Sequence, residues 1–262
     1  MEYRGRPREY FIGRYIYLTG RLAGIPTAYF TRRKDKTEVT YYYVDKTTGE
    51  KKRRRISANN PQWDKWCQIA NEHKTLRQQL KYLLMDWQSE QSGDLKEISS
   101  HYKIVKQETR GLDTKLWNSF KDNQCTKEIK HPYIYKGIKM RSQFETVIAS
   151  ILDDMHLEFK YDVRLDLIKG TVFPDFAINM PEYDRCSFIE YLGALSDYSY
   201  VGDNAEKFEK YIGSGLYINR DILFLPGDKY YRPDHQTIRE WITNMLSEIS
   251  RKCVIRKGPT DP

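Results

Sequence analysis

The sequence lacks any long apolar run, and this absence argues against a membrane-spanning helix. Such a helix needs about 20 consecutive apolar residues, whereas polar or charged residues interrupt the apolar stretches of this chain. The opening segment, MEYRGRPREYFIG, is polar and charged where a secretory signal would be apolar. We therefore expect a cytoplasmic protein with no membrane partner.

Residues that hold metals through sulfur or imidazole are few and scattered. The five histidines show no ligand spacing, and we expect them to be structural or surface residues. The cysteines lie far apart, without the paired spacing of a zinc site or the density of a disulfide framework. We therefore expect reduced, buried thiols at Cys67, Cys125, Cys186 and Cys253.

What the sequence does contain is enough apolar material for a core. Hydrophobic residues make up 39% of the 262 residues, and aromatic residues make up 14%, which argues against global disorder. We expect two parts. A basic α+β region over residues 1–135 would bind nucleic acid or a partner, and a second domain would occupy residues 136–262.

Charge is distributed unevenly along the chain, whose formal net charge is +8. Residues 1–60 contain 15 lysines and arginines against 6 aspartates and glutamates, whereas residues 141–262 contain 15 against 20. This asymmetry is expected if one part holds a polyanion and the other gathers carboxylates for chemistry. Ordinary solubility charge would also produce it, and composition alone does not separate the two explanations.

The segment TEVTYYYVDKTTGEKKRRRIS predicts a β-hairpin in the basic half, with Thr47–Gly49 as its turn. β-branched and aromatic residues, including Tyr41–Tyr43, form the outgoing strand. A basic strand beside an aromatic one suits phosphate contacts and base stacking. The alternative is a solvated edge strand whose charges prevent aggregation. The candidate nucleic-acid-binding residues are Lys51, Lys52, Arg53, Arg54 and Arg55.

Helical and extended patterns follow the hairpin. Residues 61–91 have the apolar spacing of a helix, whereas residues 92–140 carry no firm pattern. The remainder predicts a helix, three extended segments, a helix, a strand and a last helix, at residues 141–153, 158–167, 171–179, 186–193, 203–213, 222–225 and 238–249. An Asp203-x-x-Glu206 capping pattern marks the start of the second of these helices. This order predicts an α/β domain with a central sheet.

Two acidic residues, Asp175 and Glu190, lie in apolar strands on either side of a turn centred on residues 181–184. Because both are equally distant from the turn, antiparallel pairing places them opposite each other, with Cβ atoms about 4.5–5.5 Å apart. Two such charges repel in a half-buried sheet unless one is protonated or a cation lies between them. Carboxylate oxygens are hard ligands, so we predict a Mg²⁺ or Mn²⁺ site that polarises a phosphate and activates water.

Glu145 is a third candidate ligand, beside the apolar stripe of the helix at 141–153. The alternative role for Glu145 is an ion pair with Arg141, one turn earlier in the same helix. Spacing along the helix permits both roles, and the sequence leaves them open.

The order of these motifs resembles a nuclease superfamily. Arg141-Ser142-x-x-Glu145 on a helix, followed by Phe173-Pro174-Asp175-Phe176 and Ile189-Glu190-Tyr191-Leu192-Gly193, is similar to the PD-(D/E)XK, or restriction-endonuclease-like, nucleases over residues 141–226. The resemblance is to a bacterial and phage branch whose second acidic motif reads Glu-x-Leu/Phe-Gly. It implies a restriction-endonuclease-like αβββαβ core and a Mg²⁺-dependent endonuclease. The implied catalytic residues and metal ligands are Glu145, Asp175 and Glu190.

Two positions depart from the superfamily pattern. The lysine expected two residues after the second acid is replaced by Leu192, and the histidine that the branch has after that acid is Tyr191. Lys207, four residues before Tyr211, has the spacing found in the branch and is the candidate replacement for the missing lysine. A lysine near the scissile phosphate stabilises developing negative charge and helps to orient or deprotonate water. A Lys207 that points to solvent would instead indicate a domain that binds without cutting.

Three functions stay open on the sequence. The first is an active endonuclease, of a phage or mobile element, that acts on DNA in preference to RNA. The second is a catalytically inactive nuclease-like module that binds nucleic acid or a protein partner. The third is a structural or assembly protein. A homodimer is compatible with the first, since small nuclease domains often need two copies to cut both strands.

Overall fold

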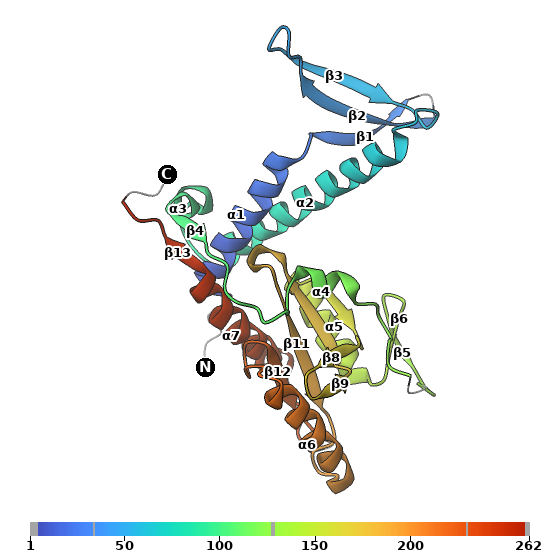
Figure 1. Cartoon of the computed structure of the whole chain (residues 1–262), viewed down its shortest axis with the longest axis vertical. Coiled ribbons are helices and arrows are strands. Elements are labelled where there is room, and N and C mark those ends of the chain that lie inside the picture. Colours follow the sequence, from blue (N-terminus) through green and yellow to red (C-terminus); the bar gives the residue numbers. More distant parts are fainter. Residues whose placement is uncertain (1–4, 34, 127–128, 229, 260–262) are drawn as a thin grey trace. The chain divides into compact units, whose positions relative to one another are not determined.

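A computed structural model describes the chain over residues 5–33, 35–126, 129–228 and 230–259. The chain divides into two compact units (Figure 1). Unit 1 comprises residues 1–13 and 101–262, and unit 2 comprises residues 14–100. Helix α1 (Arg8–Gly24) begins in unit 1 and ends in unit 2. No helix among the described residues combines the length and the apolar character needed to cross a membrane.

Unit 2 contains a three-stranded antiparallel sheet whose strands are adjacent in sequence order. Besides the second half of α1, its elements are β1 (Ala28–Arg33), β2 (Lys36–Val44), β3 (Lys51–Ile56), α2 (Trp63–Glu90) and α3 (Leu95–Ser100). The predicted hairpin is confirmed as β2–β3. Its turn is closed by the N–H of Gly49, which donates to the carbonyl of Asp45 over 2.8 Å.

One face of this sheet packs on α2. Alternate strand residues point to opposite faces, and the face with Ala28 and Val39 meets Ala70 of the helix in a buried cluster. The rings of Tyr41 and Trp66 stack with their centroids 3.7 Å apart. The apolar stripe predicted for this helix therefore supplies the core of unit 2.

The main sheet of unit 1 has four strands in the order β12-β11-β10-β7. They are β7 (Phe159–Tyr161), β10 (Phe176–Met180), β11 (Arg185–Leu192) and β12 (Ile222–Pro226). Neighbouring strands are antiparallel except β11 and β12, which are parallel. A parallel pair needs a long crossover, and a helix between these two strands supplies it.

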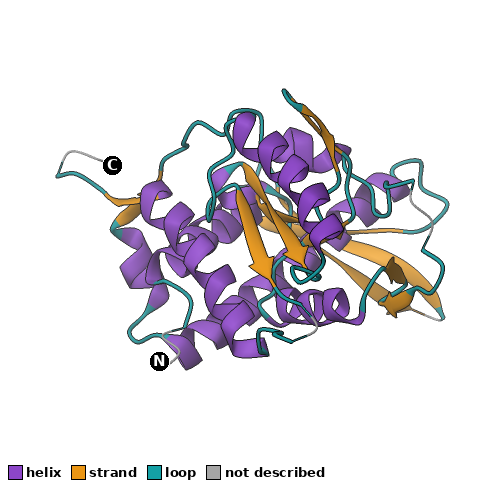
Figure 2. Ribbon diagram, turned by 90° about the horizontal axis from the view of Figure 1, so that it is seen from below, coloured by secondary structure: helices purple, strands orange, loops and turns teal. Residues whose placement is uncertain are grey.

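Helices cover both faces of the main sheet (Figure 2). The face that carries Phe188 packs against Trp117 and Tyr211 of two of these helices, and Phe144 of a third helix stacks on Tyr191 of the opposite face. The α/β class predicted for this part is thereby confirmed. The helices are α4 (Thr114–Ser119), α5 (Gln143–Asp154), α6 (Tyr198–Gly213) and α7 (His235–Cys253).

Short elements complete unit 1. A 3₁₀ turn, η1 (Pro181–Tyr183), joins β10 to β11. Three two-stranded ribbons pair β4 with β13, β5 with β6, and β8 with β9. Their strands are β4 (Tyr102–Ile104), β13 (Val254–Arg256), β5 (Tyr133–Tyr135), β6 (Ile138–Met140), β8 (Leu165–Leu167) and β9 (Gly170–Val172).

The boundary between the units lies near residue 100 and not at the predicted division between 135 and 136. β4 pairs with β13 near the other end of the chain, and α4 packs on β10 and β11. The N-terminal residues also join unit 1, where the guanidinium of Arg6 donates to the carbonyl of Met155 over 2.9 Å. These contacts connect distant segments, so composition along the chain gives no sign of them.

Three predicted elements differ from the structure. The extended segment predicted at 158–167 is divided into β7 and β8. α6 begins at Tyr198, before the predicted cap at Asp203, because the N–H of Val201 donates to the carbonyl of Asp197 over 3.0 Å and closes an earlier turn. The extended segment predicted at 171–179 is divided into β9 and β10 by Phe173-Pro174-Asp175. Proline lacks the N–H that a strand ladder requires, so the break occurs there.

Candidate active site

Asp175, which directly precedes β10, and Glu190 of β11 lie opposite each other. The antiparallel register pairs Phe176 with Ile189. Asp175, just before Phe176, is therefore opposite Glu190, just after Ile189. This is the register that the symmetric turn predicts, and Asp184 closes that turn in the left-handed conformation with φ 53°. Both carboxylates are buried, at 7% exposure for Asp175 and 2% for Glu190. The fold thus holds two acids side by side with little solvent around them.

Burial disfavours the charged forms of both acids, and repulsion by neighbouring carboxylates adds to this at Asp175. Burial, and then the charges of Glu190 and Glu145, raise the pKa of Asp175 well above its usual range. The backbone N–H of Tyr191 donates to Asp175 Oδ2 over 2.7 Å and opposes this shift. Burial also raises the pKa of Glu190, although Lys207 acts in the opposite direction. Positive charge placed between the two acids would therefore be favoured.

Helix α6 presents two side chains to Glu190. The ammonium of Lys207 pairs with Glu190 Oε1, and the hydroxyl of Tyr211, one turn later, donates to Oε2 over 3.0 Å. Tyr211 is fully buried, and its ring meets Phe224 edge to face at 5.8 Å. The side chain of Lys207 therefore points toward the acids. It is also 39% exposed, so solvent and a ligand can reach it.

Glu145 forms a capping box at the start of α5. Its Oε2 accepts the N–H groups of Arg141 and Ser142 over 2.8 and 3.2 Å, while the Ser142 hydroxyl accepts the N–H of Glu145. The hydroxyl of Tyr161 donates to the same Oε2 over 2.6 Å. The alternative ion pair between Glu145 and Arg141 is not formed, because the Arg141 guanidinium binds Asp162 at 2.8 Å instead.

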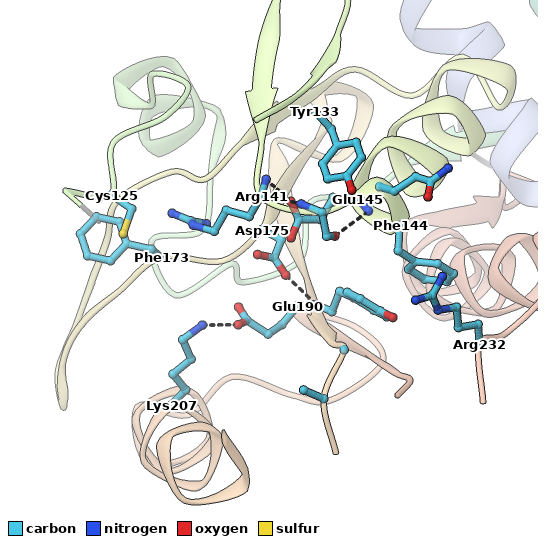
Figure 3. Close-up of a pocket in the computed structure, with 15 residues that line it drawn as sticks. Cys125, Tyr133, Arg141, Phe144, Glu145, Phe173, Asp175, Glu190, Lys207 and Arg232 are labelled. Carbon is cyan, nitrogen blue, oxygen red and sulfur yellow. Dashed lines mark hydrogen bonds and ion pairs between the residues drawn. The ribbon is translucent and has the colours of Figure 1, made fainter. Parts of the chain in front are cut away.

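A cavity of about 610 Å³ opens beside these acids (Figure 3). In this view Asp175 lies between Glu145 and Glu190, and Lys207 approaches Glu190 from the other side. Cationic side chains of Arg141, Arg232 and Lys207 line the cavity together with the three carboxylates. It therefore combines negative charge at its base with positive charge around it, an arrangement suited to a phosphate and a metal cation together.

Sequence reasoning missed several residues of this site. Tyr161 lies on β7 and reaches Glu145 only through the fold, and Arg232 comes from the segment between β12 and α7. Cys125 and Tyr133 also line the cavity, although they precede the predicted domain. No local motif marks these positions, because the fold and not a fixed spacing along the chain brings them to the acids.

The predicted metal ligands do not form a three-carboxylate cluster. Among the residues that the structure describes, no group of three or more histidine, cysteine, aspartate or glutamate side chains is arranged to hold a metal ion. Asp175 and Glu190 form a pair, and Glu145 Oε2 is engaged in the capping box.

The five basic residues Lys51 to Arg55 lie in β3 of unit 2, whereas the cavity belongs to unit 1.

The cysteines are free thiols, but only Cys186 and Cys253 are buried, whereas Cys67 and Cys125 are partly exposed. Burial raises the pKa of the Cys186 thiol to about 12, which leaves it unreactive.

Comparisons of the chain with protein-family models, curated proteins and solved structures return no match. The chemistry of the site is therefore argued from its own geometry.

Proposed function

We propose that the site in unit 1 hydrolyses phosphodiester bonds of DNA with a divalent cation, Mg²⁺ or Mn²⁺, held by Asp175 and Glu190. The observation that carries this proposal is the facing, buried carboxylate pair with the ammonium of Lys207 beside it. Burying two like charges is costly, and carboxylates so perturbed in a cleft are typical of functional sites.

The donor set fits a hard divalent cation. Mg²⁺ commonly takes one or two protein carboxylates and fills its remaining positions with water and substrate phosphate. Asp175 uses Oδ2 for the N–H of Tyr191, and its Oδ1 has no hydrogen-bond donor among the described residues. When bound, the cation would polarise a phosphate oxygen and lower the pKa of a water molecule.

The remaining side chains would orient and stabilise charge. Lys207 is fixed by Glu190 and would oppose negative charge that develops on the phosphate. Tyr211 holds the second oxygen of Glu190 and so limits rotation of that carboxylate. Arg232 lines the same cavity and would attract the phosphodiester. Glu145 acts as a positioning residue, because it orders the backbone at the start of α5.

The arrangement supports a relation to the PD-(D/E)XK nucleases. The elements α5, β7, β10, β11, α6 and β12 follow the αβββαβ order, with the β8–β9 ribbon inserted after β7. Asp175 and Glu190 stand at the positions that the two acidic motifs imply. The contact between Lys207 and Glu190 supports the view that Lys207 replaces the lysine missing at Leu192.

A catalytically inactive nuclease-like module is the second candidate. Both oxygens of Glu190 already have partners, Lys207 and Tyr211. Within the described part of the chain no three-ligand metal group is present. These two observations favour a cavity that binds a nucleic-acid phosphate through its cations without cutting.

The deciding experiment incubates the full chain with supercoiled plasmid, linear duplex, single-stranded DNA and RNA, each with Mg²⁺, Mn²⁺ or EDTA. We expect cation-dependent cleavage of DNA that EDTA and Asp175→Asn both abolish. Asp154→Asn, an exposed aspartate in the last turn of α5, is the matched control and should cut like wild type. Binding with no cleavage in any cation would favour the inactive module.

A further inference from the structure

The three-stranded sheet of unit 2 has one covered face and one open face. α2 covers the face that contains Ala28, Val39 and Tyr41. Register and alternation place the other residues of each strand on the opposite, open face. The open face therefore carries Tyr29, Thr31 and Arg33 of β1, Lys36, Glu38, Thr40, Tyr42 and Val44 of β2, and Lys51, Arg53 and Arg55 of β3. Of these, Thr40 on the central strand is buried.

The cationic side chains of β3 therefore lie on two different faces of the sheet, and their surroundings differ. On the covered side, Lys52 pairs with Asp45 at 2.6 Å, and Arg54 lies over the ring of Tyr43 at 5.5 Å. On the open side, Arg53 and Arg55 are exposed and have no ion-pair partner among the described residues. Arg54 is exposed as well, but it lies on the side of the sheet that α2 covers, so the arginines on the same face as Tyr29 and Tyr42 are Arg53 and Arg55.

Two tyrosines lie among these open-face cations. Tyr29 is 38% exposed, and its hydroxyl lies 3.0 Å from that of Tyr42 on the adjacent strand. Their ring centroids are 6.0 Å apart, and the Lys51 ammonium lies 5.2 Å from the centre of the Tyr42 ring. Aromatic rings that are accessible beside cations form a platform on which bases stack.

Charge and spacing indicate the ligand. The strands contribute five cations and one acid, Glu38, to the open face, so an anion is favoured. Successive open-face residues of β3 are roughly 6.7 Å apart along the strand, a spacing similar to that of phosphates in an extended nucleic-acid strand. A duplex would hide its base faces from the tyrosines, whereas a single strand exposes both bases and phosphates.

We propose that the open face of the β1–β2–β3 sheet binds single-stranded nucleic acid, with Tyr29 and Tyr42 stacking on bases and Lys51, Arg53 and Arg55 contacting phosphates. This inference goes beyond the proposed hydrolysis, because it concerns a second site and does not require the unit 1 cavity to cut. Of the five basic residues of β3 predicted to bind nucleic acid, the proposal retains the three on the open face, Lys51, Arg53 and Arg55.

The test measures binding of the full chain to a fluorescent oligo(dT) strand and to a duplex of equal length, in EDTA, across a range of salt concentrations. Arg53→Gln/Arg55→Gln should weaken binding and flatten the log–log salt slope by about 1.4, since each phosphate contact on a single strand contributes about 0.7. Lys52→Gln/Arg54→Gln removes the same charge from the same strand. This covered-side pair should retain nearly the wild-type slope.

Two kinds of variant test the tyrosines: leucine removes the aromatic ring, whereas phenylalanine removes only the hydroxyl. Tyr42→Leu and Tyr29→Leu should each weaken oligo(dT) binding by roughly 5-fold to 150-fold. Tyr42→Phe and Tyr29→Phe keep the ring and should bind like wild type, while an unchanged circular dichroism spectrum shows that each variant is folded.

Three results would overturn the proposal: absence of oligo(dT) binding, equal losses for the two charge pairs, or a duplex preference with no effect of the leucine variants. Equal losses would indicate general attraction to the net charge of the chain. Because binding is measured in EDTA, its failure is distinguishable from a failure of the unit 1 site to cut.

Discussion

The ammonium of Lys207 pairs with the carboxylate of Glu190, and the two groups come from a strand, β11, and from the helix that follows it, α6. Leu192 lies two residues after Glu190 on β11, on the same side of the sheet, where the nuclease superfamily has its lysine. Positive charge is therefore brought to the acids by α6 and not by the strand itself.

Replacing Lys207 by alanine tests whether this charge acts in cleavage. We expect Lys207→Ala to lower single-turnover plasmid cleavage by roughly 10²–10³, because a positioned cation is removed from the site of developing negative charge. Lys210 is the internal control, since its side chain lies against β9 near Gly170 and does not line the cavity. Equal cleavage by Lys207→Ala and wild type would exclude this role.

Placing a lysine on strand β11 should restore part of that loss of cleavage. We expect Leu192→Lys, made in the Lys207→Ala background, to recover part of the lost cleavage, because residue 192 projects from the same face as Glu190. Leu195→Lys adds the same charge at an exposed position outside β11 and should recover none. Recovery by both lysines alike would show that only net charge matters.

The pKa of Asp175 predicts an unusual pH dependence of stability in EDTA. Burial and the neighbouring carboxylates raise this pKa in the folded protein, so the folded state holds a proton that the unfolded chain has released. The contribution of Asp175 to the free energy of unfolding is then fully present below the pKa of the unfolded chain, about 3.9, and is lost as the pH rises through the pKa of the folded protein. Asp175→Asn should remove this loss and raise the melting temperature at pH 7.

A cation should reverse the effect in the wild type. Mg²⁺ that binds only the folded state raises the melting temperature, and the increase grows with the logarithm of the Mg²⁺ concentration once this exceeds the dissociation constant. Asp175→Asn should abolish that increase. Asp154→Asn should keep both the pH profile and the response to Mg²⁺. A wild-type protein whose melting temperature ignores Mg²⁺ and Mn²⁺ would contradict a cation site at Asp175 and Glu190.

Tyr211→Phe isolates the hydroxyl that supports Glu190. The ring stays in the core beside Phe224, but a hydrogen bond to a buried carboxylate is lost. Bonds to charged groups contribute about 1.5–3 kcal/mol, and we expect a loss of that size in the free energy of unfolding in urea. Tyr231→Phe, at a tyrosine that is 53% exposed, should change stability little.

The sequence by itself determined the elements whose signals are local. Alternation and turn residues predicted the β2–β3 hairpin, apolar spacing predicted α2, α5 and α7, and the turn between β10 and β11 set the register of Asp175 and Glu190. Each depends on residues close in the chain, where strand alternation, helix periodicity and turn chemistry act directly.

Only the tertiary structure decided what depends on distant segments. It placed residues 101–135 in unit 1, where β4 pairs with β13. It paired the guanidinium of Arg141 with Asp162 and not with Glu145, and it positioned the hydroxyl of Tyr161 to donate to Glu145 in the capping box. It also separated Arg53 and Arg55 from Lys52 and Arg54, because α2 covers one face of the sheet. Loop closure and packing set these contacts, and neither leaves a fixed spacing in the sequence.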